Sequence, residues 1–151
     1  MEYFILFLPL VAAIISGFFG NIIGKKGSQI ITSLFITITA LLSFVVLYKV
    51  INFSYSENLI IATWINSGNL NVSWSIKIDT LSAVMLVVVT FVSALVHIYS
   101  IGYMADDPHK PRFMAYLSLF TFAMLTLVTS DNFLQLFFGW EGVGLCSYFL
   151  I

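Results

Sequence analysis

Long apolar runs alternate with short polar segments along the whole chain. The predominantly apolar stretches cover residues 3–23, 28–48, 81–101, 113–129 and 133–151. Each is close to the ~20 residues that a helix needs to cross roughly 30 Å of hydrocarbon. The pattern therefore predicts an all-α polytopic membrane protein with five transmembrane helices.

The segment between the second and third runs has a different period. Apolar and polar residues alternate strictly from Leu70 to Asp79, which is typical of a half-buried strand. A second β-capable run, Leu59 to Ile65, precedes it, and turn-forming residues fill positions 66–69. We expect a β-hairpin over about residues 59–78. It should lie over the membrane surface, because an open ribbon would leave backbone groups unpaired in hydrocarbon.

Composition supports a membrane environment. The 151 residues are 60% hydrophobic and only 9% charged, more apolar surface than a soluble domain of this size can bury. The net charge of −1 argues against a nucleic-acid partner, which would need a basic excess. No positive residue precedes Lys25, so the first run is expected to be a retained span and not a secretory signal.

Basic residues predict the orientation of the spans. The turns after the first and third spans hold Lys25, Lys26, Lys110 and Arg112, whereas the opposite side holds only Lys49 and Lys77. Because basic residues favour the inner side, we expect the N-terminus and the hairpin to lie outside. The last run reaches Ile151 without a polar flank, so we expect a single membrane domain, residues 1–151, that is truncated.

Glu141 is the main candidate for chemistry. It lies eight residues past Phe133, about 12 Å along a helix and so close to the middle of the bilayer. An ionisable residue there costs about 2.5–3.5 kcal/mol or more. All six basic residues lie in turns or at span ends, so none can pair with Glu141 at that depth. We infer a proton-handling role, with a partner beyond Ile151 or on another subunit.

A structural role for Glu141 is the alternative. Gly139, Gly142 and Cys146 form a small-residue face that allows close helix approach, so Glu141 could serve only to fix helix packing. Gly139, Gly142 and Gly144 are assigned structural roles in this helix. Cys146 is a single cysteine in an apolar run and predicts neither a disulfide nor a metal site.

Other polar residues receive secondary assignments. His97 shares a helix face with Thr90, Ser93 and Ser100, a stripe that should face protein, and it is a second candidate for proton translocation. Asp79 precedes the third span and is expected to cap it. The crowded turn with Asp106, Asp107 and His109 does not predict a metal site. Gln135 and Tyr148 are interpreted as span filling and interfacial anchoring.

The segment Gly139–Tyr148, Gly-Trp-Glu-Gly-Val-Gly-Leu-Cys-Ser-Tyr, resembles a motif of a known family. It is similar to the fifth helix of the largest antiporter-like subunit of respiratory complex I, the NADH-quinone oxidoreductase subunit L and mitochondrial NADH dehydrogenase subunit 5 family. Shorter matches follow the same order along the chain: Ile78-Asp79, His97–Ser100, Arg112-Phe113 and Ser130–Asn132.

The resemblance implies a proton-translocating subunit of NADH:quinone oxidoreductase in a bacterial or mitochondrial inner membrane. It implies that Glu141 couples to a lysine on a later helix, beyond Ile151, so this chain alone should not pump protons. The partners would be other membrane-arm subunits and the lipid bilayer. The resemblance implies no cofactor on this chain: NADH, flavin and iron–sulfur clusters belong to other subunits, and quinone is the substrate of the complex.

Two alternative functions remain at this point. The chain could belong to a multi-subunit cation/proton antiporter, whose subunits share the motif without electron transfer. It could also be a membrane scaffold in which Glu141 only packs.

Overall fold

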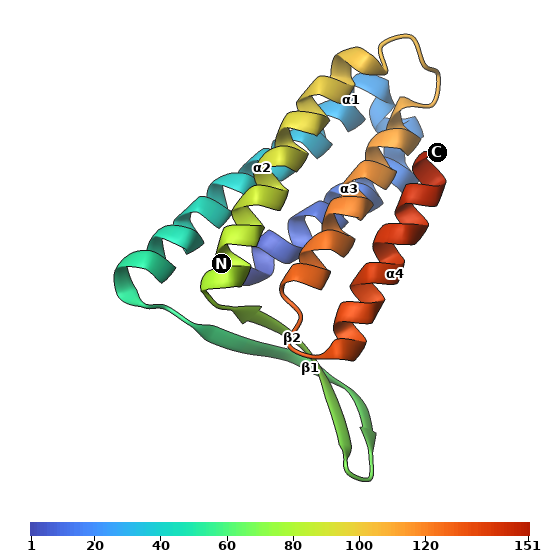
Figure 1. Ribbon diagram of the computed structural model, residues 1–151. Coiled ribbons are helices and arrows are strands. Elements are labelled where there is room, and N and C mark those ends of the chain that lie inside the picture. The colour runs from blue at the N-terminus through green and yellow to red at the C-terminus, as the bar shows by residue number, and fades with distance from the viewer.

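The computed structural model describes all 151 residues and consists of helices and one hairpin (Figure 1). The elements, in chain order, are α1 (Glu2–Phe53), β1 (Glu57–Ser67), β2 (Leu70–Ile78), α2 (Thr80–Tyr103), α3 (Lys110–Val128) and α4 (Phe133–Leu150). All four helices are long and apolar enough to cross a membrane. The mostly helical membrane architecture agrees with the class expected from the apolar runs.

The expected count of five separate helices is not matched. Residues 3–23 and 28–48 lie in one helical element, α1, with a single non-helical residue, Gly24, at φ 82° and ψ 166°. A straight helix of this length would extend for about 78 Å. However, the hydroxyl of Tyr55 donates a hydrogen bond to Glu2 at 3.3 Å, so the chain reverses direction at Gly24. The expected four-residue turn is a one-residue break, because glycine adopts a positive φ without a Cβ clash.

The hairpin joins β1 and β2 in an antiparallel pair and projects beyond one end of the helices (Figure 1). Ser67 pairs with Leu70, so the loop has only two residues, and Gly68 has the positive φ of 59° that such a turn requires. The strands extend further than the expected 59–78, since pairing begins at Glu57 with Ile78. The N-terminus lies at the hairpin end and the C-terminus at the other end.

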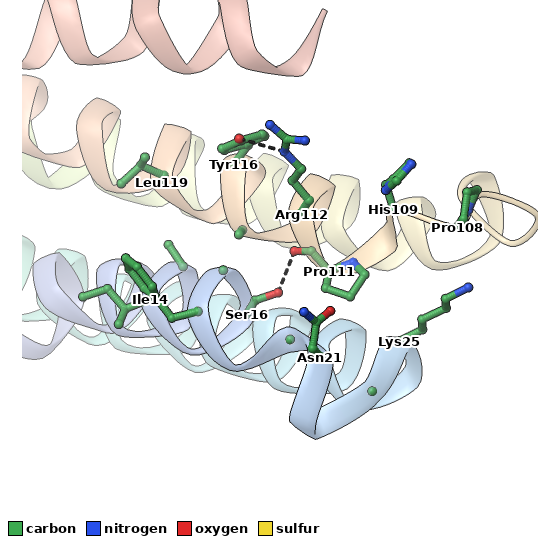
Figure 2. Close-up of a pocket in the computed structure, with 16 residues that line it drawn as sticks. Ile14, Ser16, Asn21, Lys25, Pro108, His109, Pro111, Arg112, Tyr116 and Leu119 are labelled. Carbon is green, nitrogen blue, oxygen red and sulfur yellow. Dashed lines mark hydrogen bonds between the residues drawn. The ribbon is translucent and has the colours of Figure 1, made fainter.

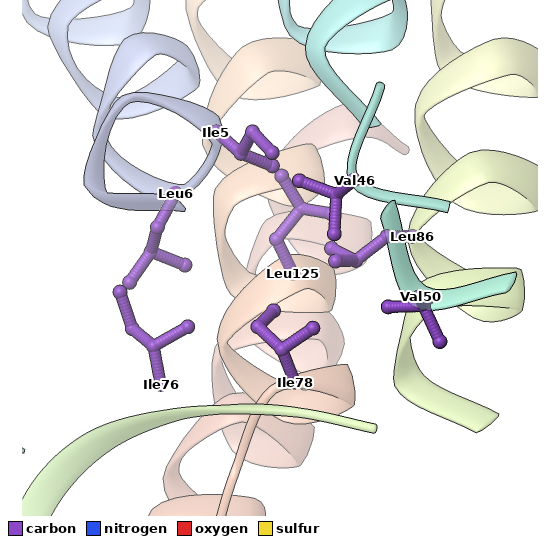
Figure 3. Packing of buried hydrophobic residues seen from close by; sticks show 9 residues of the cluster. Ile5, Leu6, Val46, Val50, Ile76, Ile78, Leu86 and Leu125 are labelled. Carbon is purple, nitrogen blue, oxygen red and sulfur yellow. The ribbon is translucent and has the colours of Figure 1, made fainter. Parts of the chain in front are cut away.

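The largest hydrophobic cluster lies where the hairpin meets the helices (Figure 3). It combines both halves of α1 with α2, α3 and β2. Its members are Ile5, Leu6, Val46, Val50, Ile76, Ile78, Ala83, Leu86 and Leu125. The alternation in β2 therefore buries Ile76 and Ile78 in the cluster at the end of the helix bundle, whereas Lys77 between them is exposed.

Asp79 caps α2, as the sequence indicates. Its carboxylate accepts hydrogen bonds from the backbone N–H of Ser82 at 2.7 Å and from the Ser82 hydroxyl at 2.9 Å. These bonds, the backbone one above all, lower the pKa of Asp79. The cap satisfies one of the unpaired N–H groups at the start of α2.

We predict that Asp79→Ala destabilises the full-length protein by about 1 kcal/mol, because a cap bond is lost. Asp79→Asn should keep the cap at neutral pH. The lowered pKa of Asp79 means that its ionised form adds stability above the unfolded-state pKa of ~3.9. This contribution disappears as the pH falls through the lowered folded-state pKa. Thermal unfolding between neutral and acidic pH measures both effects, and an equal acid sensitivity of Asp79→Asn and wild type contradicts the assignment.

Candidate functional site

The start of α4 is hydrogen-bonded to the outer edge of β2. The amide of Gln135 accepts from the backbone N–H of Ser75 at 3.0 Å and donates to the backbone oxygen of Ser75 at 2.7 Å. Asn132 donates to the carbonyl of Ser73 at 2.8 Å, and the N–H of Lys77 donates to the carbonyl of Thr129 at 2.9 Å. The turn between α3 and α4 thus satisfies the strand edge that would otherwise be unpaired.

Additional contacts hold the same junction from the β1 side. Asp131 accepts a hydrogen bond from Asn58 at 2.6 Å and forms an ion pair with Lys77 at 3.5 Å. The rings of Trp64, Trp74 and Phe138 pack edge to face, with centroids 4.9–6.1 Å apart. The hairpin therefore fixes the first two turns of α4 with both polar and aromatic contacts.

The small-residue face of α4 lies against α3. A Cβ added to Gly139 would come within 2.7–2.8 Å of the backbone and Cβ of Leu127. A Cβ on Gly142 would meet the Ala123 side chain at 3.1 Å, and Cys146 is buried. Gly144, in contrast, faces open space. The two helices thus approach closely through Gly139 and Gly142.

Glu141 lies on the opposite part of α4, exposed to the surroundings of the chain. At 100° per residue it is about 130° around the helix from the middle of the small-residue face. It is the ninth of the 18 residues of α4, so it lies at mid-length. The two ion pairs of the chain are Met1 with Glu2 and Lys77 with Asp131, so Glu141 is in neither. The carboxylate therefore has no partner within this chain.

His97 is fully buried between α2 and α3. Its Nδ1 lies 2.8 Å from the carbonyl oxygen of Ser93, which can only accept, so Nδ1 carries a hydrogen. Its Nε2 lies 3.1 Å from the hydroxyl of Ser118, and the Ser93 hydroxyl is 2.6 Å from that of Thr121. No hydrogen bond joins His97 to Glu141. The two candidate residues therefore do not form one site.

The polar stripe of α2 faces protein, as expected. Thr90, His97 and Ser100 are buried, and Thr90 shares a 2.7 Å hydrogen bond with Ser43 in the second half of α1. The stripe therefore joins α2 to α1 at Thr90 and to α3 at Ser93 and His97. Such interhelical bonds satisfy polar groups that hydrocarbon would leave unpaired.

Gln135 is the residue whose role the sequence analysis missed. Its apolar surroundings in the sequence predict span filling, whereas the structure buries it completely as the link between α4 and β2. One sequence signal was present: Asn132 and Gln135 have the spacing of an N-cap and the third helical residue in a capping box. Asn132 does cap α4, by accepting from the N–H of Gln135 at 2.8 Å.

We predict that Gln135→Met lowers the free energy of unfolding by about 1–3 kcal/mol, because it leaves the buried N–H and C=O of Ser75 without partners. Gln29→Met is the matched control, since Gln29 is also buried but makes a single long bond of 3.5 Å to Ile101. Denaturant titration and protease sensitivity of the hairpin compare the two. Similar losses of unfolding free energy in both variants would contradict a stabilising role for the hydrogen bonds between Gln135 and Ser75.

We also predict a graded effect of alanine at the glycines. Gly139→Ala must displace the backbone of Leu127 and should cost about 1–3 kcal/mol, less any gain in helix propensity. Gly142→Ala meets only a side chain and should cost less, and Gly102→Ala, with nothing within 4 Å, should be neutral or stabilising. Unfolding midpoints of the three variants give the order, and equal effects exclude close packing of α4 on α3.

Comparison with known proteins identifies one family of similar sequences. Residues 64–114, from β1 to the start of α3, match the family model described as NADH-Ubiquinone oxidoreductase (complex I), chain 5 N-terminus. All 151 residues align at 54% identity with NADH-ubiquinone oxidoreductase chain 5 of Arabidopsis thaliana, covering 23% of that protein. The same chain of Triticum aestivum is 53% identical over 151 residues, which are 22% of its length.

A bacterial relative has a corresponding similarity. NADH-quinone oxidoreductase subunit L of Rickettsia conorii is 51% identical over 150 residues, or 97% of the chain and 22% of the relative. The chain thus spans only about a fifth of the length of the curated relatives that it matches. These similarities confirm the resemblance seen in the motif around Glu141. The chain belongs to the family of NADH-ubiquinone oxidoreductase chain 5 and NADH-quinone oxidoreductase subunit L.

Proposed function

We propose that the full-length protein is a proton-translocating membrane subunit of complex I, which couples electron transfer from NADH to quinone with proton pumping. The names of the relatives support the assignment to complex I. The position of Glu141 at mid-length of an apolar helix supports a role in proton translocation. In this proposal NADH, flavin and iron–sulfur clusters lie on other subunits, and this chain carries no redox group. The other subunits of the membrane arm are its partners.

The observation that carries the proposal is the free carboxylate of Glu141 at mid-length of an apolar helix. A residue needed only for packing should lie in the helix interface, yet Gly139, Gly142 and Cys146 form that interface on another face. A lone carboxylate in hydrocarbon is costly when charged, and a basic partner restores the charged form. A carboxylate that switches between these states can store and release a proton. Its partner would be supplied by the rest of the full-length protein.

His97 has a geometry that is compatible with a relay. In the neutral ring Nδ1 donates to the Ser93 carbonyl, and Nε2 accepts from the hydroxyl of Ser118. If Nε2 takes up a proton, the Ser118 hydroxyl can rotate and accept instead, so no heavy atom must move. We propose His97 as a secondary proton-carrying residue within the bundle of α1, α2 and α3.

We propose that the N-terminus and hairpin face the periplasm or intermembrane space. Both lie at one end of the helices, and the loop between α2 and α3 lies at the other (Figure 1). Gly24 belongs to that other end, because it lines a pocket together with Pro108 and His109 of this loop. The second end has the larger number of basic residues, which favours the inner side. The membrane is then the bacterial or mitochondrial inner membrane.

Glu141→Gln in the full-length protein should reduce proton pumping and coupled quinone reductase activity to a small fraction of wild type, because the amide cannot ionise. Glu141→Asp keeps an ionisable group and should retain part of the activity. Pumping is measured in vesicles, and the amount of assembled complex is measured in the same membranes.

The proposal fails if Glu141→Gln pumps at the wild-type rate per assembled complex. A lower amount of complex with unchanged activity per complex would instead favour a packing role for Glu141. The two readouts therefore separate proton handling from scaffolding.

A further inference from the structure

A pocket lies at the end opposite the hairpin, between the first half of α1 and the start of α3 (Figure 2). Its volume is about 790 Å³, within the range of small-molecule sites. The hollow exists because the helices meet here through small residues: Ala13, Gly17, Gly20 and Ala115 all line it. Neither Glu141 nor His97 lines it.

The floor of the pocket is a close contact between α1 and α3. Ser16 donates a hydrogen bond to the carbonyl of Pro111 at 2.8 Å. A Cβ on Gly20 would come within 2.7 Å of the Pro111 ring. The two helices are therefore held together at this level, and their packing fixes the shape of the pocket.

One end of the pocket is basic. Lys25 extends from the break in α1, and His109 and Arg112 project from the start of α3 (Figure 2). No carboxylate lines the pocket, and Asp107 of the neighbouring loop binds the backbone N–H of His109. Arg112 lies over the ring of Tyr116 and donates to its hydroxyl at 3.0 Å, so its guanidinium is oriented. The positive charge of this end of the pocket favours binding of an anionic group.

The other end of the pocket is apolar. Ile14, Phe18 and Leu119 line it, and Phe18 is 81% exposed, so this wall opens to the hydrocarbon surroundings. Ile14 lies ten residues before the break at Gly24, or about 15 Å along the first half of α1. The pocket therefore extends from the membrane boundary well into the hydrocarbon. A soluble anion would use only its basic end.

We propose that this pocket binds an anionic phospholipid, with its headgroup at the end lined by Lys25, His109 and Arg112 and an acyl chain along Ile14, Phe18 and Leu119. Basic pockets between transmembrane helices at the inner side suit such headgroups. The lipid would fill the hollow between α1 and α3 and stabilise their junction. This inference does not depend on the proton role of Glu141.

The test uses the full-length protein in its intact complex, reconstituted in nanodiscs. The probes are phosphatidylglycerol and phosphatidylcholine, each with the same photoreactive group on one acyl chain, and mass spectrometry locates the labelled peptides. We expect preferential labelling by phosphatidylglycerol of the peptides that contain Ile14, Phe18 and Leu119. Lys25→Gln and Arg112→Gln should each weaken this labelling about fivefold, the effect of one basic residue near a membrane surface.

Matched controls separate the pocket from general surface charge. Lys26→Gln removes the same charge next to Lys25 but outside the pocket, and should leave the labelling unchanged. Arg112→Lys keeps the charge and should retain most of the labelling. If Arg112→Gln loses labelling only because it misfolds, Arg112→Lys still tests the charge. An excess of inorganic phosphate should not displace the lipid.

Four results would overturn the proposal. Equal labelling by the two lipids excludes recognition of an anionic headgroup. An equal loss in Lys26→Gln assigns the effect to the surface charge alone. Absence of label from the pocket peptides in the wild-type complex, or its displacement by inorganic phosphate, points to another occupant, a neighbouring subunit or a soluble anion.

Discussion

The hydrogen bonding of Gln135 to the backbone of Ser75 is the interaction on which the arrangement of the candidate site depends. A two-stranded hairpin has two unpaired edges, and an apolar helix that begins at a membrane surface must have a fixed starting point. The Gln135 side chain serves both needs at Ser75, and Asn132 and Thr129 extend the contact to Ser73 and Lys77 of the same strand edge. Glu141 lies six residues after Gln135 in α4, so its height and direction follow from this junction.

The packing of α4 on α3 determines which way Glu141 points. Because Gly139 and Gly142 allow the helix to approach α3 closely, the face with Glu141 is turned outward. The same sequence motif thus has two physical functions. Its glycines hold the helix, and its carboxylate is left free for a partner outside this chain. Packing and proton handling are therefore assigned to different residues of one motif.

Local patterns predicted much of the fold, because they depend on neighbouring residues. The apolar runs, the alternation from Leu70 to Asp79 and the cap at Asp79 all follow from such patterns. The single-residue break at Gly24 was not predicted, since a four-residue turn has the same composition. The link between Gln135 and Ser75 joins residues 60 positions apart, and only the folded chain brings them together. The sequence identifies Glu141 from its depth in the membrane. Only the structure shows that Glu141 lies on an exposed face of α4, away from the contact with α3.

Infrared difference spectroscopy of the full-length complex can detect whether Glu141 takes up and releases a proton. Energisation should change the protonation of the Glu141 carboxyl group, seen as a carboxyl band that shifts in heavy water. The band should be absent in Glu141→Gln and retained, at a shifted frequency, in Glu141→Asp. A wild-type band that persists unchanged in Glu141→Gln, or no carboxyl change in the wild type, would contradict a proton-handling role for Glu141.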